Sequence, residues 1–210
     1  MKLNELLGTE FPLIQGGMAN IATGEFAAAV SNAGALGLIG AGGMNADTLR
    51  EHIRRCKALT NKPFGVNIML MNPAAAEMAK VVVEEGVQVV TTGAGVPSQY
   101  IPAWKEAGIK VFPVVPATTL VRRLAPLGVD GFIAEGTESG GHVGELTTMA
   151  LVPQVRDMTD LPVIAAGGIA SGRQLAAAFA LGACGAQIGT CLLVSEECPI
   201  HENYKQALLK

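Results

Sequence analysis

Short apolar runs alternate with longer amphipathic segments along the whole chain. Valine and isoleucine dominate the runs, and glycine or polar residues bound most of them. A run of about four to eight such residues is typical of a buried β-strand. The pattern predicts eight strands, at residues 12–15, 36–40, 64–70, 87–92, 110–115, 131–135, 162–167 and 186–190.

Between these runs, apolar residues recur at helical spacing. Several of the helical segments end in glycine, a frequent helix stop. The clearest segments are 23–34, 46–60, 73–86, 100–108 and 172–183. Because the strands are apolar on both faces, we expect parallel strands that are covered by helices. The sequence therefore predicts an α/β protein, a (β/α)8 TIM barrel that forms one domain over residues 1–210.

A doubly wound open sheet is the alternative fold. Such sheets bind dinucleotides through a G-x-G-x-x-G turn after the first strand. Here the first predicted strand leads into QGGMAN, which lacks that spacing. The pattern therefore favours the closed barrel.

Composition and charge exclude several classes of function. Half of the 210 residues are hydrophobic and the formal net charge is −3, so a basic surface for nucleic acid is not expected. No apolar run approaches the ~18 residues of a membrane span, and the polar residues near the N-terminus argue against a signal peptide. We expect a cytoplasmic protein that binds neither nucleic acid nor membrane.

The residues that commonly carry catalysis also exclude some chemistry. The four cysteines form no C-x-x-C pair and the three histidines lie far apart, so no metal site is predicted. Lys62 precedes its strand and Lys110 begins one, so neither lies at the C-terminal end of a strand, which argues against a Schiff-base aldolase. Without a strong nucleophile, a bound cofactor is expected to carry the difficult chemistry.

In a barrel of this kind, ligands bind at the carboxyl ends of the strands. Most of these ends are small or rich in glycine here, which allows a flat molecule to lie close to the backbone. Gly167 and Gly168 lie at the end of the seventh strand, and Gly189 and Thr190 lie at the end of the eighth. Backbone N–H groups at these two positions can hold a phosphate, although glycines there also serve tight turns.

Three polar residues stand out at the strand ends. Asn67 lies inside an apolar strand, where its amide needs a partner, either a ligand or a neighbouring loop. Glu135 closes the sixth strand and is expected to accept a hydrogen bond from a ligand or from backbone. His142 lies between glycines, so its imidazole can approach a ligand and transfer a proton near neutral pH.

Six motifs occur in a distinctive order: PLIQGGMA, KPFGVNIML, VVTTGAG, AEGTESGGHVGELTT, PVIAAGGIASG and AQIGT. Together they resemble the FMN-dependent enoyl-acyl-carrier-protein reductase II family, which belongs with the nitronate monooxygenases (2-nitropropane dioxygenase-like flavoproteins). The resemblance extends from about residue 3 to residue 205, and the stretch NKPFGVNIMLMNP is closer to the reductases.

This resemblance implies FMN at the mouth of the barrel and His142 at the position of the active-site histidine. In the reductases NADH or NADPH reduces FMN, which passes hydride to a trans-2-enoyl thioester on acyl carrier protein or CoA, a step of fatty acid synthesis. His142 would orient the thioester or handle the proton at its α-carbon. Family members are often dimers, so a homodimer is expected. The implied FMN contacts are Gly17, Met18, Asn67, Glu135, Gly167, Gly168, Gln187, Gly189 and Thr190.

Alternatives to the reductase remain open. The first is a nitronate monooxygenase, in which the same histidine takes a proton next to nitrogen. The second is a truncated, catalytically inactive FMN-binding barrel. It is suggested because the family continues past the position of Lys210 into a helical part that covers the mouth, and because Cys191 stands where the family commonly has arginine. The third is a flavin-free phosphosugar barrel.

Overall fold

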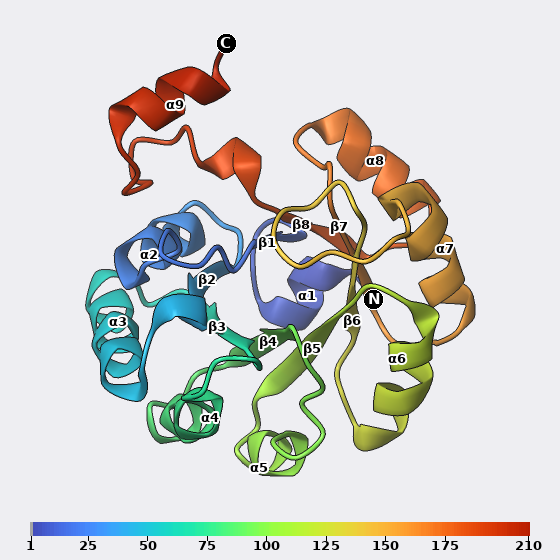
Figure 1. The fold of residues 1–210 in the computed structure, drawn as a ribbon, viewed down its shortest axis with the longest axis horizontal. Helices are drawn as coiled ribbons and strands as arrows, with labels where there is room; N and C mark the ends of the chain where they lie inside the picture. The colour runs from blue at the N-terminus through green and yellow to red at the C-terminus, as the bar shows by residue number, and fades with distance from the viewer. Residues whose placement is uncertain (1) are drawn as a thin grey trace.

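The computed structural model describes residues 2–210 and shows eight parallel strands surrounded by helices (Figure 1). Each predicted strand is present, and its bounds agree with the prediction to within two residues. The strands are β1 (Leu13–Gln15), β2 (Gly37–Gly40), β3 (Phe64–Met69), β4 (Val89–Gly93), β5 (Lys110–Val115), β6 (Phe132–Glu135), β7 (Val163–Ala166) and β8 (Gly185–Ile188).

The barrel closes through its first strand. β1 pairs with β8, and the remaining strands pair with their neighbours in sequence order down to β2. On the other side of β1, the Gln15 N–H donates to the Leu36 carbonyl at 2.9 Å, and the Leu36 N–H donates to Leu13 at 2.9 Å. An open sheet has two free edges, so the doubly wound alternative is wrong.

Helices cover the outside of the barrel, and the short α1 lies across its N-terminal end (Figure 1). Glycines with positive φ follow α2, α4, α5 and α8, as their helix-stop pattern predicts. The helices are α1 (Leu3–Leu7), α2 (Gly24–Asn32), α3 (Ala46–Leu59), α4 (Ala75–Glu84), α5 (Ile101–Glu106), α6 (Thr118–Leu124), α7 (Thr148–Asp157), α8 (Gly172–Ala180) and α9 (Glu202–Leu208). Three short 3-10 turns are η1 (Ala41–Gly43), η2 (Ala125–Leu127) and η3 (Thr190–Leu192).

Apolar side chains fill the barrel interior in the half nearest the N-terminal ends of the strands. Ile133 of β6 and Ile164 of β7 belong to this inner cluster, and Leu3 and Leu7 of α1 join it from the N-terminal end. The fit is tight: a Cβ added to Gly185 would lie 2.4 Å from the Leu3 side chain. Helix α1 therefore closes this end and leaves the opposite end for a ligand.

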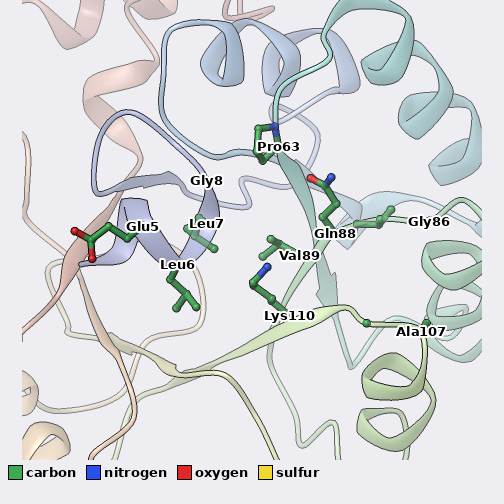
Figure 2. Close-up of a pocket in the computed structure, with 12 residues that line it drawn as sticks. Glu5, Leu6, Leu7, Gly8, Pro63, Gly86, Gln88, Val89, Ala107 and Lys110 are labelled. Carbon is green, nitrogen blue, oxygen red and sulfur yellow. The ribbon is translucent and has the colours of Figure 1, made fainter. Parts of the chain in front are cut away.

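A surface cavity of about 460 Å³ lies beside α1 at the N-terminal end, lined in part by Leu7, Val89 and Lys110 (Figure 2). Lys110 is the first residue of β5, so its amine lies at the end opposite to the predicted site, as the sequence indicates. The cavity contains none of the predicted site residues. Within residues 2–210, no helix is long and apolar enough to cross a membrane.

Candidate active site

Polar side chains point into the barrel at its C-terminal end. Residues two apart on a strand face the same side, so Glu135 and Ala166 face inward like Ile133 and Ile164 before them. Gln187 pairs with Ala166 in the next strand and faces inward as well. In β6 and β8 the inward-facing residue thus becomes polar two residues beyond Ile133 and Gly185, whereas β7 keeps the small Ala166.

Asn67 forms part of this polar layer from the opposite wall. It pairs with Thr91, two residues beyond the inward-facing Val89, and its amide donates to the Thr91 hydroxyl at 2.8 Å. The loop after β1 lies directly against it: a Cβ added to Gly17 would be 2.3 Å from the Asn67 Cβ. Only glycine fits there, so the sequence-predicted Gly17 and Asn67 are brought together.

Met18 connects the loop after β1 to the end of β8. A Cβ added to Gly189 would meet the Met18 Sδ at 3.7 Å, and one added to Gly16 would meet its Cγ at 3.9 Å. The Gly16 N–H donates to the Ile188 carbonyl at 2.7 Å, which fixes the two strand ends relative to each other. The loop after β1 therefore contacts both the end of β3 and the end of β8.

Glu135 and Gln187 lie in an environment with little water. Burial raises the pKa of the Glu135 carboxyl, and a hydrogen bond with Ser139 acts in the opposite direction. The Gln187 Oε1 atom is buried and has no hydrogen-bond partner within residues 2–210. A buried acceptor without a donor is costly, so this oxygen is suited to a ligand that supplies an N–H or O–H group.

The loops after β7 and β8 present free backbone donors. Gly167 and Gly168 have φ values of 106° and 70°, which favour glycine. In the described part of the chain, no backbone carbonyl accepts from the N–H groups of Gly167, Gly168, Gly189 or Thr190. Four unpaired N–H groups on two adjacent loops are suited to an anion such as phosphate.

His142 lies on the loop of residues 136–147, between β6 and α7, and is exposed. The Gly136 N–H donates to Ala166 at 3.0 Å, while a Cβ added to Gly144 would lie 2.6 Å from Pro116. The loop therefore extends from the end of β5 to the end of β7 (Figure 1). This places His142 at the same end of the barrel as the other predicted site residues.

These features fit FMN. Its phosphate suits the free N–H groups of the two glycine loops, and its flat ring system suits a mouth with glycine at several strand ends. The unpartnered Gln187 oxygen can accept from a ring N–H group. Within residues 2–210, no group of three or more His, Cys, Asp or Glu side chains that could hold a metal ion comes together.

Two further residues of this region are not predicted by the sequence. The Glu138 carboxylate accepts hydrogen bonds from the Thr148 N–H at 2.8 Å and from the Thr148 hydroxyl at 3.0 Å. These bonds, led by the one from the Thr148 backbone, outweigh the effect of burial and lower the pKa of Glu138. A glutamate ten residues before its partner matches no capping pattern, so only the structure reveals the contact.

The fold and this site define a (β/α)8 barrel with its polar groups and glycine loops gathered at the C-terminal end, as in barrel enzymes. The chain belongs to the nitronate monooxygenase family, a family of flavin-dependent oxidoreductases, which it matches over residues 1–210.

Among curated relatives, the chain is 39% identical to the (3aS,4S,5R,7aS)-5-hydroxy-7a-methyl-1-oxo-octahydro-1H-indene-4-carboxyl-CoA dehydrogenase of Mycobacterium tuberculosis, over 99% of this chain and 59% of the relative. It is 36% identical to a nitronate monooxygenase of Paraburkholderia phytofirmans, over 97% of this chain and 69% of the relative. The chain thus spans less than two thirds of the mycobacterial relative.

Two solved structures are similar throughout the barrel. FabK from Thermotoga maritima is 52% identical with a TM-score of 0.95, covering 97% of this chain and 66% of that one. The nitroalkane oxidase from Streptomyces ansochromogenes is 30% identical with a TM-score of 0.92, covering 99% of this chain and 72% of that one.

Proposed function

We propose that the chain is the barrel of an FMN-dependent enoyl-acyl-carrier-protein reductase, which uses NADH or NADPH to reduce trans-2-enoyl thioesters in fatty acid synthesis. One observation carries this proposal: the identity to FabK is 52%, whereas it is 36% to the nitronate monooxygenase and 30% to the nitroalkane oxidase. The motifs of the sequence favour the same reaction.

The glycine loops would hold the cofactor by its phosphate, through the N–H groups of Gly167, Gly168, Gly189 and Thr190. Because no acceptor within the described chain competes for these donors, binding breaks no protein hydrogen bond. FMN, when bound, supplies hydride transfer from NADH or NADPH to the β-carbon of the enoyl thioester. Gly17 and Met18 would support it from the loop after β1.

The inward polar residues would orient the cofactor and keep its polar edge paired. Gln187 offers a buried acceptor. The Asn67 amide, which Thr91 holds at 2.8 Å, offers its remaining hydrogen-bonding capacity from the opposite wall. Glu135 is assigned to the same layer, where burial raises the pKa of its carboxyl and so favours the proton-bearing form.

His142 would handle the proton that completes the reduction. Hydride addition to the β-carbon leaves negative charge at the α-carbon and the thioester oxygen, which a proton must neutralise. Imidazole is the side chain whose ordinary pKa suits this transfer near neutral pH. The exposed position of His142 on its loop lets a substrate approach from solvent.

The substrate partner in this proposal is an enoyl thioester on acyl carrier protein or CoA. The 39% identity to a dehydrogenase named for a carboxyl-CoA compound supports a thioester ligand. A homodimer is proposed as the assembly by analogy with the family alone.

A nitronate monooxygenase is the second candidate, and the match of residues 1–210 to that family favours it. In this reaction His142 would take a proton from the carbon next to nitrogen. The residues assigned to FMN would keep their roles, since both reactions need a proton handled beside the same cofactor.

One absorption experiment tests both candidates. The purified protein is saturated with FMN and titrated anaerobically with NADH and with NADPH, and crotonyl-CoA is then added. Bleaching by reduced nicotinamide and recovery with crotonyl-CoA supports the reductase. Bleaching by an alkyl nitronate, with no response to reduced nicotinamide, supports the monooxygenase and refutes the reductase. Failure to bind FMN would contradict both candidates. Binding of FMN without bleaching by reduced nicotinamide or by a nitronate would favour the inactive FMN-binding barrel.

A further inference from the structure

Thr148, the first residue of α7, connects three segments at the mouth. Its side chain is buried, with 8% of the residue exposed. Its hydroxyl lies 3.0 Å from Glu138 Oε2, 3.1 Å from the Ala166 carbonyl and 3.0 Å from the Gly167 carbonyl. A hydroxyl has one proton to donate, so these three acceptors share it. Thr148 therefore joins the loop of residues 136–147 to the end of β7.

Glycines surround this threonine because nothing larger fits. A Cβ added to Gly136 would lie 2.2 Å from the Thr148 nitrogen, and one added to Gly167 would lie 2.7 Å from its hydroxyl. A Cβ added to Gly168 would lie 3.1 Å from the Glu138 Cβ. Glu138, near the base of the loop that carries His142, and Thr148 therefore both lie against the glycine loop assigned to the phosphate.

The loop of residues 136–147 is fastened at its base in two places. The Thr137 N–H donates to the Leu146 carbonyl at 3.0 Å, and the Thr148 N–H donates to Glu138 at 2.8 Å. The second bond is charge-assisted, since the acceptor is a carboxylate. His142 lies in the middle of the loop, away from these two hydrogen bonds. The orientation of the two loop ends therefore determines which positions the imidazole can reach.

We propose that Glu138 and Thr148 are positioning residues, which fix the loop carrying His142 against the Gly167–Gly168 loop and so align proton transfer with the bound cofactor. This inference rests on the proposed function, but its contacts belong to the protein itself. The alternative is a purely structural role, in which the Glu138 carboxylate only stabilises the start of α7. Removing it would then change stability and leave the proton step unaltered.

The experiment uses Glu138→Gln and Thr148→Val, each with a matched control. Glu145→Gln changes an exposed carboxylate of the same loop, and Thr147→Val changes the exposed neighbour of Thr148. Thr148→Ser keeps the hydroxyl and is the rescue variant. The first measurement is hydrogen exchange of residues 136–147, followed by mass spectrometry, which requires no turnover. Exchange should become faster in Glu138→Gln and Thr148→Val and stay unchanged in both controls and in Thr148→Ser.

The second measurement is the pH profile of kcat for crotonyl-CoA reduction in the FMN-saturated protein. A misplaced proton donor costs on the order of 10²-fold in kcat, and KM should change much less. The profile of both positioning variants should also shift, and the controls and Thr148→Ser should keep the wild-type profile.

Unchanged exchange in Glu138→Gln and Thr148→Val would overturn the proposal. Faster exchange with a wild-type pH profile would overturn it too, because the contact would then serve helix stability alone. If the wild-type protein turns over no substrate, the proposed function fails, and the exchange measurement still decides whether these residues fix the loop.

Discussion

The side-chain amide of Gln187 carries a buried oxygen without a partner, and Gln187→Leu tests what this oxygen is for. Leucine is close to glutamine in size, and the neighbours across the ladder are Ile14 and Ala166, both apolar. The substitution removes an acceptor that no donor within residues 2–210 satisfies. We therefore expect the variant to be more stable without FMN and to bind FMN more weakly.

The expected change in the free energy of unfolding follows from how deeply the Gln187 side chain is buried. An unsatisfied buried acceptor costs about 1–3 kcal/mol. Because Gln187 as a residue is only partly buried, we expect the lower limit, a gain of about 1 kcal/mol. For a chain of this size, that corresponds to a rise in Tm of about 2–4 °C. Loss of one neutral hydrogen bond to the cofactor should raise the Kd for FMN roughly two- to tenfold.

Gln15 in the neighbouring strand β1 is the matched control. It is fully buried, but its Oε1 accepts a hydrogen bond from the Leu38 N–H at 3.1 Å. Gln15→Leu would leave this N–H unpaired, but it would also remove the buried Gln15 Nε2 donor, which has no partner within residues 2–210. The two effects oppose each other, so this variant should not show the gain in stability expected of Gln187→Leu. The assay is thermal unfolding of FMN-free protein followed by circular dichroism, with FMN affinity from fluorescence titration. A Gln187→Leu variant that melts at or below the wild-type temperature, or that binds FMN equally well, would refute the reasoning.

Three further substitutions test other parts of the molecule. Gly17→Ala should lower stability by about 1–3 kcal/mol, because its Cβ would lie 2.3 Å from a side-chain carbon of β3; Gly93→Ala, with nothing within 4 Å, is the control in the same denaturant series. Glu85→Gln should lower stability at pH 7 by about 1–2 kcal/mol. Hydrogen bonding to Arg54 lowers the pKa of Glu85. The contribution of Glu85 to stability is therefore present above its ordinary pKa near 4.5 and is lost as pH falls through the lowered pKa. A difference in urea midpoint between variant and wild type that is the same at pH 3 and pH 7 would contradict this. His142→Ala should retain bound FMN, measured by absorbance, and lose about 10²–10⁴-fold in kcat, and wild-type turnover would exclude it as the proton donor.

The eight strands could be predicted because their runs are largely apolar on both faces, which follows from helices outside and a packed interior. Two bounds differ from the prediction by two residues, and the one at the start of β4 has a local cause. Val87 was assigned to the fourth strand, which begins at Val89. Val87 instead ends the turn after α4: its N–H donates to the Val82 carbonyl at 2.9 Å, and the Gly86 N–H donates to Val83 at 3.0 Å. Such a turn often places an apolar residue after its glycine, and this residue resembles the start of a strand.

The candidate site was predictable where a polar residue interrupts an apolar strand. Asn67 and Glu135 were found in this way, since an amide or carboxyl in such a run requires a specific environment. The sequence pattern alone does not single out Gln187 as a site residue. It is predicted as an FMN contact only because the chain resembles the flavoprotein family. The contact between Glu138 and Thr148 was not predictable, because it depends on how a loop folds back onto the helix that follows it, and no spacing rule describes this.

The barrel separates stability from binding along its axis. Ile133 and Ile164 pack below the polar layer together with α1, whereas Glu135 and Gln187, two residues further along β6 and β8 from their apolar or glycine neighbours, lack such packing. Polar groups without partners destabilise the FMN-free barrel, and a ligand that supplies donors offsets this cost. The same layer would serve the reductase and the monooxygenase, since both bind FMN. The choice between the two reactions must then depend on groups beyond this layer, such as those of the loop of residues 136–147 that carries His142.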